Sequence, residues 1–145
     1  MAALAIIGPL VTISGIWWRD HKAQLDDDAK VNAEINLIIQ TATDFDPIVR
    51  RYITLARAGD PQANGYLDRI RSDPRVSRMN DVIAKPVTQW PSIQSSDAFR
   101  TYYKDAFDLL ELSVDKRPIM TLDEGVKGYD GKLAALQRAL NAARR

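Results

Sequence analysis

Residues 2–18, AALAIIGPLVTISGIWW, contain no charged side chain, and the charged stretch RDHK follows them directly. As an α-helix this segment is roughly 26 Å long, slightly less than the ~30 Å hydrocarbon core of a typical bilayer. A soluble domain would have to surround such a helix, because the helix has no polar face. We therefore expect residues 1–18 to form a single transmembrane anchor that precedes a domain over residues 19–145. An unprocessed or partly processed export signal and a helix buried in a soluble core are the alternatives.

The apolar segment ends in residues that suit a membrane surface. Trp17 and Trp18 can place their rings among the headgroups, and Arg19 and Lys22 can extend their charges into water. We interpret these four residues as the membrane interface. Since positive charge follows the segment and only the amino terminus precedes it, the positive-inside rule places the domain on the cytoplasmic or stromal side.

The composition excludes several kinds of chemistry. With 20 Lys and Arg against 19 Asp and Glu, the net charge is +1, which gives no reason to expect nucleic acid as a partner. The chain has no cysteine, and its one histidine, His21, stands beside the apolar segment. Residues 26–28 are consecutive aspartates without the spacing of a calcium loop, and no phosphate-binding loop or nucleophile motif occurs. We predict that the protein is not an enzyme and binds no metal, cofactor or small-molecule substrate.

After residue 30 the sequence repeats apolar residues with helical spacing. Steps of four and three form one seam at Val31, Ile35, Ile38, Ala42, Phe45, Val49, Tyr52 and Ala56. Pro47 interrupts this seam, which predicts either a kink or a new helix with Asp46 as its N-cap. Two further Asp-Pro pairs, at Asp60 and Asp73, predict two more short helices, and Gly59 is placed to end the helix before them.

Two longer helices complete the expected fold. The first, from about Ser96 to Asp115, has one broad apolar face made by Phe99, Tyr102, Tyr103, Ala106, Phe107, Leu110 and Val114. The second opens with Thr121 and Glu124 at capping-box spacing, and its apolar seam is Val126, Tyr129, Leu133, Leu136, Leu140 and Ala143. We predict an all-α protein, with an N-terminal transmembrane helix and an antiparallel four-helix-type bundle whose short helices begin at Asp-Pro pairs.

Positive and negative charges are unevenly distributed along the domain. Residues 46–90 hold eight Lys and Arg against five Asp and Glu, whereas residues 91–126 hold four against seven. Four of the positive side chains, Arg69, Arg71, Arg75 and Arg78, lie within ten residues. Because arginine suits carboxylate recognition, these four residues are candidates for binding an acidic partner. The equally weighted alternative is that they pair with the acidic helix of their own bundle.

Two short segments and the C-terminal part of the chain resemble a known family. AKVNAEI at 29–35 is similar to the start of the first bundle helix in the PsbQ-type extrinsic proteins of photosystem II, and WPSIQ at 90–94 resembles their Trp-Pro-Ser helix entry. The last helix pair of that family is similar to the stretch from Phe107 to Leu140, including Thr121, Glu124, Lys127, Tyr129, Leu133, Leu136 and Leu140. In the family the Trp-Pro-Ser motif follows the first helix closely, whereas here three Asp-Pro units intervene.

The resemblance implies a non-catalytic subunit that covers the lumenal side of photosystem II and helps it retain its inorganic ions. It places the bundle in the thylakoid lumen, on the opposite side from the one that the positive-inside rule indicates. The expected partners are the lipid bilayer and other subunits of the membrane complex. The alternatives are a single-pass accessory or assembly subunit of a respiratory or other bacterial membrane complex, and a soluble binding module whose apolar helix closes a ligand pocket.

Overall fold

The computed structural model describes residues 4–113 and 121–145. These residues form helices and no strand, so the all-α prediction is confirmed. The helices are α1 (Leu4–Arg57), α2 (Gln62–Ile70), α3 (Pro74–Ile83), α4 (Ile93–Leu109) and α5 (Leu122–Ala142), with a short 3-10 turn, Val87–Gln89, before α4. Val114 and Asp115, expected at the end of the first of the two longer helices, lie outside the described residues.

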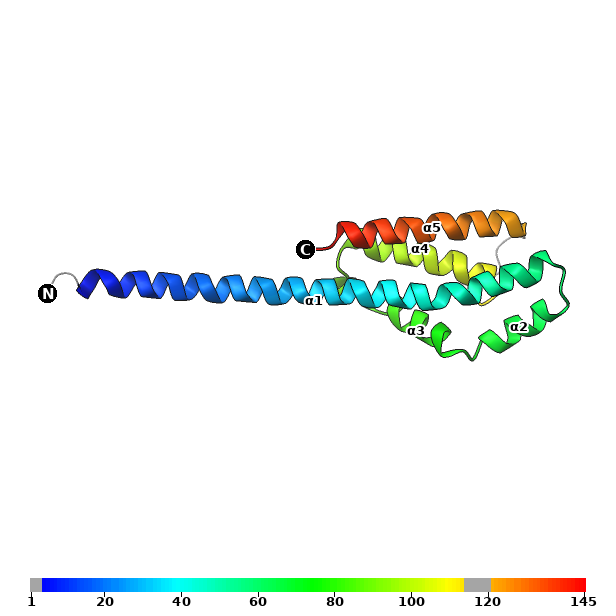
Figure 1. Cartoon of the computed structure of the whole chain (residues 1–145), viewed down its shortest axis with the longest axis horizontal. Helices are drawn as coiled ribbons and strands as arrows, with labels where there is room; N and C mark the ends of the chain where they lie inside the picture. The colour runs from blue at the N-terminus through cyan, green and yellow to red at the C-terminus, as the bar shows by residue number, and fades with distance from the viewer. Residues whose placement is uncertain (1–3, 114–120) are drawn as a thin grey trace.

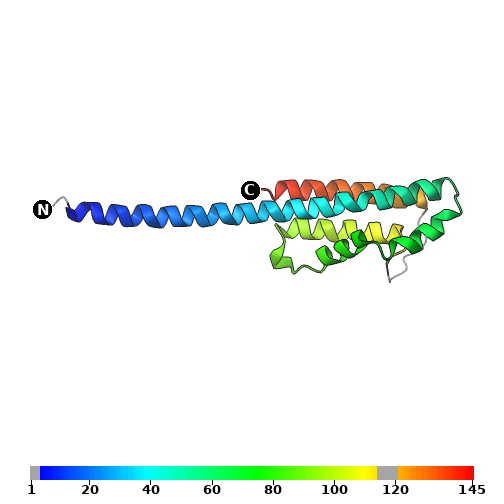
Figure 2. The ribbon, with the colours of Figure 1, turned by 60° about the horizontal axis from the view of Figure 1, so that its bottom comes forward.

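The helices form a bundle around the second half of α1 (Figure 1). α2 and α3 return along α1 as one arm broken into two helices, α4 runs forward again, and α5 returns beside α1 and α4. The chain thus traces four antiparallel arms, as the sequence predicts, with two short helices in the second arm. The first half of α1 extends alone beyond the bundle in both views of the ribbon (Figures 1 and 2).

Among residues 4–113 and 121–145, no helix combines the length and the apolar character that crossing a bilayer requires. The transmembrane helix expected over residues 1–18 is therefore not supported by the structure, and its first three residues lie outside the described part of the chain. α1 also continues past residue 18 without a break, so no helix boundary separates the expected anchor from the domain.

Pro47 lies inside α1, and the prediction of a new helix capped by Asp46 is wrong. Proline lacks the N–H that would bond to the carbonyl four residues earlier, but one lost hydrogen bond does not end a helix that is packed on both sides of the proline. The flanking side chains of Phe45, Ile48 and Val49 are fully buried. The segment after the proline is inclined relative to the straight first part of α1 (Figure 1), as a proline in a helix favours.

The core fills the space between α1 and the other arms. The seam predicted on α1 is largely confirmed, since Ile35, Ile38, Ala42, Phe45 and Val49 are buried. Aromatic side chains from α4 and α5 pack against it: the fully buried residues include Phe99, Tyr102 and Tyr129, and the rings of Phe45 and Phe107 stack with centroids 5.8 Å apart.

One of the two predicted caps of the short helices is confirmed. Asp73 is the N-cap of α3, and its carboxylate accepts a hydrogen bond from the Arg75 amide at 2.9 Å. The N-cap of α2 is Pro61, which has no side-chain cap, and the Asp60 carboxylate before it accepts a hydrogen bond from the Gln62 amide at 2.8 Å. Gly59 has the positive φ of 62° predicted for a residue that ends a helix. Thr121 and Glu124 form the predicted reciprocal capping box of α5.

α4 begins earlier and ends earlier than the sequence predicts. Its N-cap is Ser92, which forms a capping box with Ser95 and so extends the helix N-terminally of Ser96. Its end is set by Glu111, which adopts a φ of 55°. α4 then packs closely on α5: a Cβ added at Gly128 would lie 3.2 Å from a carboxylate oxygen of Asp105.

Candidate functional site

The part of α1 that precedes the bundle consists of the apolar segment and a polar connection, residues 19–30, which we call the stalk. Of the four residues predicted at the membrane interface, Trp17 and Trp18 precede the stalk on α1 and Arg19 is its first residue. Lys22, also in the stalk, is exposed. Extending the core seam backwards from Val31 reaches Asp28, Gln24 and His21, so apolar residues no longer occupy the seam positions. The bundle core ends at this point because the stalk has no apolar face to add to it.

Residues at the C-terminal end of α5 hold α1 where it leaves the bundle. The Asn32 side chain donates to the backbone oxygen of Arg145 at 2.8 Å, and its amide oxygen accepts from the Arg145 backbone N–H at 3.1 Å. Arg144 donates to the side chain of Asn36 at 2.9 Å, and the guanidinium of Arg145 lies 3.8 Å from the carboxylate of Asp28. Asp28, Asn32 and Asn36 are spaced by four residues and share one face of α1.

A second contact supports the same part of α1 from another side. Lys85, just after α3, forms an ion pair with Glu34 of α1. Burial lowers the pKa of the Lys85 ammonium. The buried ring of Trp90 donates a hydrogen bond from Nε1 to the Lys85 carbonyl at 3.3 Å, which fixes the backbone that presents the lysine. The junction between stalk and bundle is therefore held by two separate sets of contacts.

The four arginines predicted to bind a partner do not act alike. Arg75 forms a two-point contact with its own N-cap residue, Asp73, with N–O distances of 3.0 and 2.9 Å. Arg78 lies 3.4 Å from Asp44 of α1. Arg69 and Arg71 are exposed, and neither forms an ion pair with a described residue. Thus two of the arginines have carboxylate partners in the bundle, but on α1 and at the start of α3 and not on the acidic α4.

The fold adds an arginine that sequence reasoning missed. Tyr66 of α2 donates its hydroxyl hydrogen to the Ile48 carbonyl of α1 at 3.0 Å. Burial raises the pKa of Tyr66, and the positive charges of Arg75, Arg51 and Arg69 oppose that increase, so all three arginines lie within electrostatic range of the phenol. Arg51 is distant from the others in sequence, and only the packing of α2 on α1 brings it near them. We call Tyr66, Arg51, Arg69, Asp73 and Arg75 the Tyr66 cluster.

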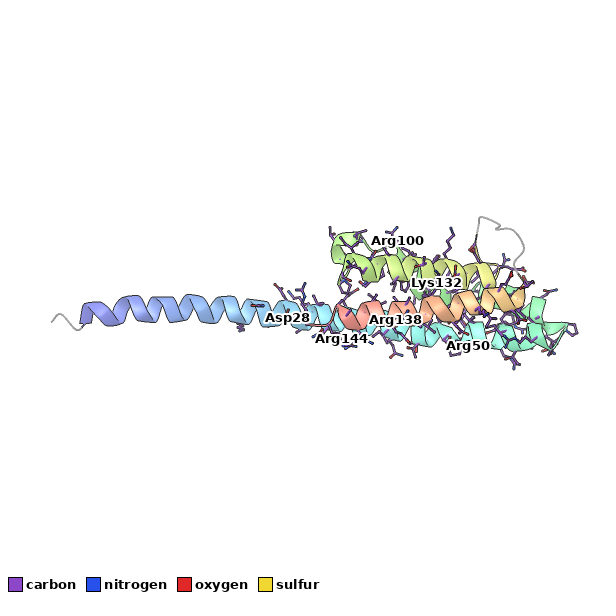
Figure 3. The ribbon with its side chains drawn as sticks, turned by 90° about the horizontal axis from the view of Figure 1, so that it is seen from above. Asp28, Arg50, Arg100, Lys132, Arg138 and Arg144 are labelled. Carbon is purple, nitrogen blue, oxygen red and sulfur yellow. The ribbon has the colours of Figure 1, made fainter. Side chains whose placement is uncertain are left out.

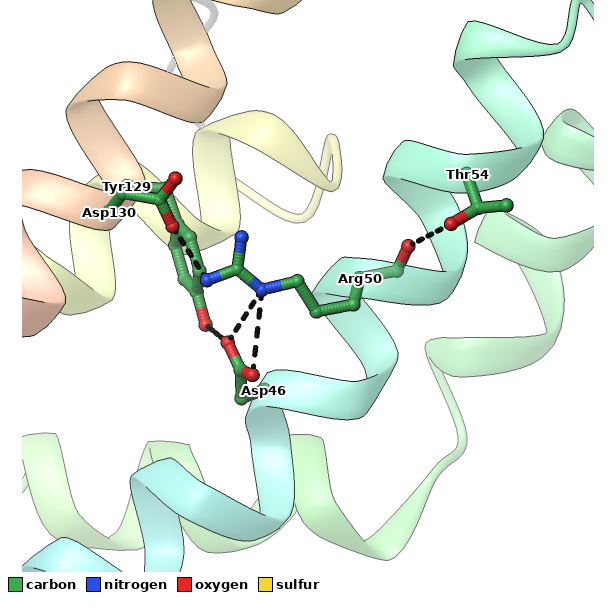
Figure 4. A network of polar contacts seen from close by, with 5 residues as sticks. All are labelled: Asp46, Arg50, Thr54, Tyr129 and Asp130. Carbon is green, nitrogen blue, oxygen red and sulfur yellow. Dashed lines mark hydrogen bonds and ion pairs between the residues drawn. The ribbon is translucent and has the colours of Figure 1, made fainter.

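A second polar network joins α1 to α5 (Figure 4). The hydroxyl of Tyr129 donates to the Asp46 carboxylate at 2.5 Å. Arg50 lies over the Tyr129 ring at 5.2 Å and pairs with Asp130 at 2.6 Å and with Asp46 at 3.3 Å, so its pKa is raised, mainly by the bond to Asp130. Burial raises the pKa of the Tyr129 phenol. The network therefore connects α1 to α5.

No candidate metal-binding site occurs in the part of the chain that the structure describes. Within these residues no three side chains of His, Cys, Asp or Glu come together in a way that could hold an ion. The features that distinguish the molecule are the uncharged sequence at the start of α1 and the Tyr66 cluster on the bundle.

No protein-family model matches the chain, and no curated protein or solved structure is significantly similar to it. The resemblance to PsbQ-type proteins therefore stays a prediction from the sequence.

Proposed function

We propose that this protein is a non-catalytic structural subunit of a membrane protein complex, held at the bilayer by residues 2–18 as a single-pass anchor. The observation that carries the proposal is the continuity of α1, which bears the uncharged sequence at one end and the core of the bundle at the other. A continuous helix transmits both position and orientation, so an anchored first segment would hold the bundle in a defined place.

The surroundings of α1 support an external partner for its first segment. No described helix lies beside the first half of α1 (Figures 1 and 2), and residues 4–18 carry no charge. Apolar side chains on such a helix are stabilised by leaving water, so lipid or other apolar helices would cover them. The small residues Gly8, Ser14 and Gly15 would permit close approach of neighbouring helices within a membrane.

Photosystem II is the specific complex that the PsbQ resemblance supports. In that case the bundle would lie in the thylakoid lumen, where it would cover and stabilise the lumenal face of the complex. The positively charged residues Arg19 and Lys22 instead favour a cytoplasmic bundle, and with it an accessory or assembly role in a respiratory or other bacterial membrane complex. Protease protection in sealed native vesicles distinguishes the two locations. Added protease reaches only the outer face of the vesicles, so it digests the bundle in one orientation and spares it in the other.

Flotation with vesicles tests the anchor. The full chain and a variant lacking residues 2–18 are each mixed with phosphatidylcholine–phosphatidylglycerol vesicles and centrifuged through a sucrose gradient at 50 and 500 mM NaCl. We expect the full chain to float at both salt concentrations and the shortened chain to stay at the bottom while keeping a helical circular dichroism spectrum. A Trp90→Phe variant leaves Trp17 and Trp18 as the only indoles, and their emission should shift to the blue with vesicles.

Two results would reject the anchor. One is a shortened chain that floats as well as the full chain, because the apolar segment would then be irrelevant to binding. The other is a full chain that remains a monodisperse monomer without detergent and ignores the vesicles. Membership of the complex is tested separately, by finding whether the full chain migrates with photosystem II or with another complex from native membranes in a mild detergent.

A further inference from the structure

The face made by α1, α2 and α3 carries positive charge that the bundle does not neutralise. In the Tyr66 cluster the only carboxylate is Asp73, and Arg75 already pairs with it. Arg51 and Arg69 are exposed and form no ion pair with a described residue. Two positive charges therefore remain next to the half-buried Tyr66 ring.

The packing of α2 on α1 brings the two arginines to one face. Arg51 lies three residues after Ile48, about one turn along α1 from the carbonyl to which Tyr66 bonds. The hydroxyl of Tyr66 is bonded to α1, and the neighbouring Leu67 and Ile70 are buried, so α2 is held against α1 at this point. Arg69 lies over the Tyr66 ring with its guanidinium carbon 6.0 Å from the centroid. Successive residues of a helix are 100° apart, so the acidic Asp68 lies on the other flank of α2 from Tyr66 and Arg69. Its carboxylate is therefore not part of the cluster.

The chemistry of the cluster suits a carboxylate-bearing protein surface. Guanidinium groups present a planar set of donors that matches a carboxylate, and they lose their hydration more easily than an ammonium does. Tyrosine and arginine are also the residues that dominate binding energy in protein interfaces, because they combine a large apolar area with hydrogen bonding. Tyr66, with Arg69 over its ring and Arg51 nearby on α1, has this composition.

The position of the cluster makes lipid an unsuitable occupant. The helix between Trp18 and Arg51 is roughly 50 Å long at 1.5 Å per residue. α2 also lies at the end of the bundle farthest from the N-terminus (Figure 1). An upright α1 would therefore keep the cluster far from the headgroups of the bilayer that holds residues 2–18.

We propose that the Tyr66 cluster is the site at which the bundle docks on an acidic surface of a neighbouring protein subunit, with Arg51 and Arg69 pairing with its carboxylates. This inference rests on the proposed function, because it names the surface through which the anchored subunit would contact its complex. It also separates the four arginines of the sequence. Arg69 faces the partner, Arg75 pairs with the N-cap of its own helix, Arg78 pairs with Asp44 of α1, and Arg71 is exposed.

A charge-reversal pair tests the site in the full chain. The variant Arg51→Glu/Arg69→Glu is compared with Arg100→Glu/Arg138→Glu, whose exposed arginines lie on α4 and α5 (Figure 3). Both variants change the net charge equally. We expect the first pair to lower retention of the protein in its complex, extracted from native membranes with a mild detergent, by about tenfold in 150 mM NaCl, and the second pair to have little effect.

Photo-crosslinking identifies what occupies the site. The exposed Gln62 precedes Arg69 by seven residues on the same flank of α2, and the exposed Gln137 on α5 is its control. With Gln62→p-benzoylphenylalanine in native membranes, we expect crosslinks to an Asp- and Glu-rich segment of one protein, lost on adding Arg51→Glu/Arg69→Glu. The corresponding substitution at Gln137 should not give that product.

Each contrary outcome overturns the docking site. Crosslinks from Gln62 to lipid would show that the cluster faces a membrane, and equal retention of the two charge-reversal variants would show that no charged partner binds there. Vesicle flotation of both variants separates this inference from the proposed function. If they float like the unaltered chain but retention is unchanged, the anchor stands and the docking site fails.

Discussion

Tyr129 illustrates how the bundle accommodates polar atoms in its interior. Its side chain is fully buried, yet the hydroxyl meets the Asp46 carboxylate, and Arg50 covers the ring from the side of α1 (Figure 4). A buried hydroxyl without a partner would destabilise the fold, so this arrangement explains how a phenol can occupy a core position. The sequence identified Tyr129 as a seam residue, but the partner of its hydroxyl lies on a helix 83 residues away.

The burial of Tyr129 predicts a loss of stability at alkaline pH. Burial raises the pKa of Tyr129, whereas an unfolded tyrosine loses its proton near pH 10. Above about pH 10 the unfolded state therefore binds fewer protons than the folded state, and the free energy of unfolding falls as the pH rises. Below about pH 10 the buried, protonated Tyr129 makes its full contribution to the free energy of unfolding. Urea unfolding at pH 8.0, 9.5 and 10.5 measures the decline.

A phenylalanine variant assigns the decline to this residue. Tyr129→Phe should lower the free energy of unfolding at pH 8 by about 1–2 kcal/mol, because Asp46 loses a donor, and should make the loss above pH 9.5 shallower. Tyr103→Phe is the comparison: burial also raises the pKa of Tyr103, but this side chain is only half-buried and donates to Asn80 at 2.6 Å, so its removal should change the alkaline decline less. An unchanged alkaline decline in Tyr129→Phe would contradict the assignment.

The arginines of RIRSDPRVSR show how much of a single residue's pairing can be predicted from the sequence. Arg69, Arg71, Arg75 and Arg78 have the same chemistry, and their spacing from one another does not indicate which of them are paired. Arg75 differs from Arg69 because it follows an N-cap aspartate by two residues, and its side chain can turn back to that carboxylate. Arg78 differs because α3 packs beside Asp44 of α1, which is a tertiary contact.

The ends of the helices were predictable where they depend on local chemistry. Asp73 before Pro74, and Thr121 three residues before Glu124, act within one turn, and both predictions are confirmed. The continuation of α1 through Pro47 was not predictable locally, because burial of its flanking residues outweighs the lost hydrogen bond. The early end of α4 was missed for a different reason, since Glu111 occupies a backbone conformation that usually belongs to glycine.

Glu111 and Gly59 offer a reciprocal test at two helix ends. Glu111 has a positive φ of 55°, and Gly59 has one of 62°. In both cases this residue and the one after it donate backbone hydrogen bonds to carbonyls in the last turn of the helix. Glu111→Gly should raise the free energy of unfolding by about 1 kcal/mol, because glycine adopts this conformation without the steric cost of a Cβ. Gly59→Ala should lower it by a similar amount, and no neighbouring atom would contact the added methyl group. Chemical denaturation of both variants measures the effect.

The sign of the two changes is the decisive result. If Glu111→Gly destabilised the protein, the glutamate side chain would be contributing more than its backbone conformation costs. If both variants left the stability unchanged, neither residue would determine where its helix ends.

The whole molecule depends on how firmly the bundle holds α1 at the stalk. Arg144 and Arg145 bond to Asn32 and Asn36 at one side, and Lys85 pairs with Glu34 at another. These contacts stabilise a helix that continues into the polar stalk, where no core supports it. An isolated helix as short as the stalk would be only marginally stable in water.

Removing Arg144 and Arg145 should loosen this junction without unfolding the bundle. Amide hydrogen exchange in residues 24–36 should become faster by about three- to tenfold, because several exposed hydrogen bonds are lost, while exchange in α4 and α5 should change little. Arg138→Ala, at an exposed position of α5, is the control. Unchanged exchange in residues 24–36 would mean that the rest of the bundle suffices to hold α1.

The unbroken course of α1 also sets a rotational phase between the first segment and the bundle. Each residue of an α-helix turns the chain by 100°, so one residue inserted into the stalk would rotate the Tyr66 cluster by that angle about the axis of α1. Removing seven residues would bring the cluster about 10 Å nearer to Trp18 but leave it facing within about 20° of its original direction. Evolution could therefore shorten or lengthen this protein in steps of whole heptads more easily than by single residues.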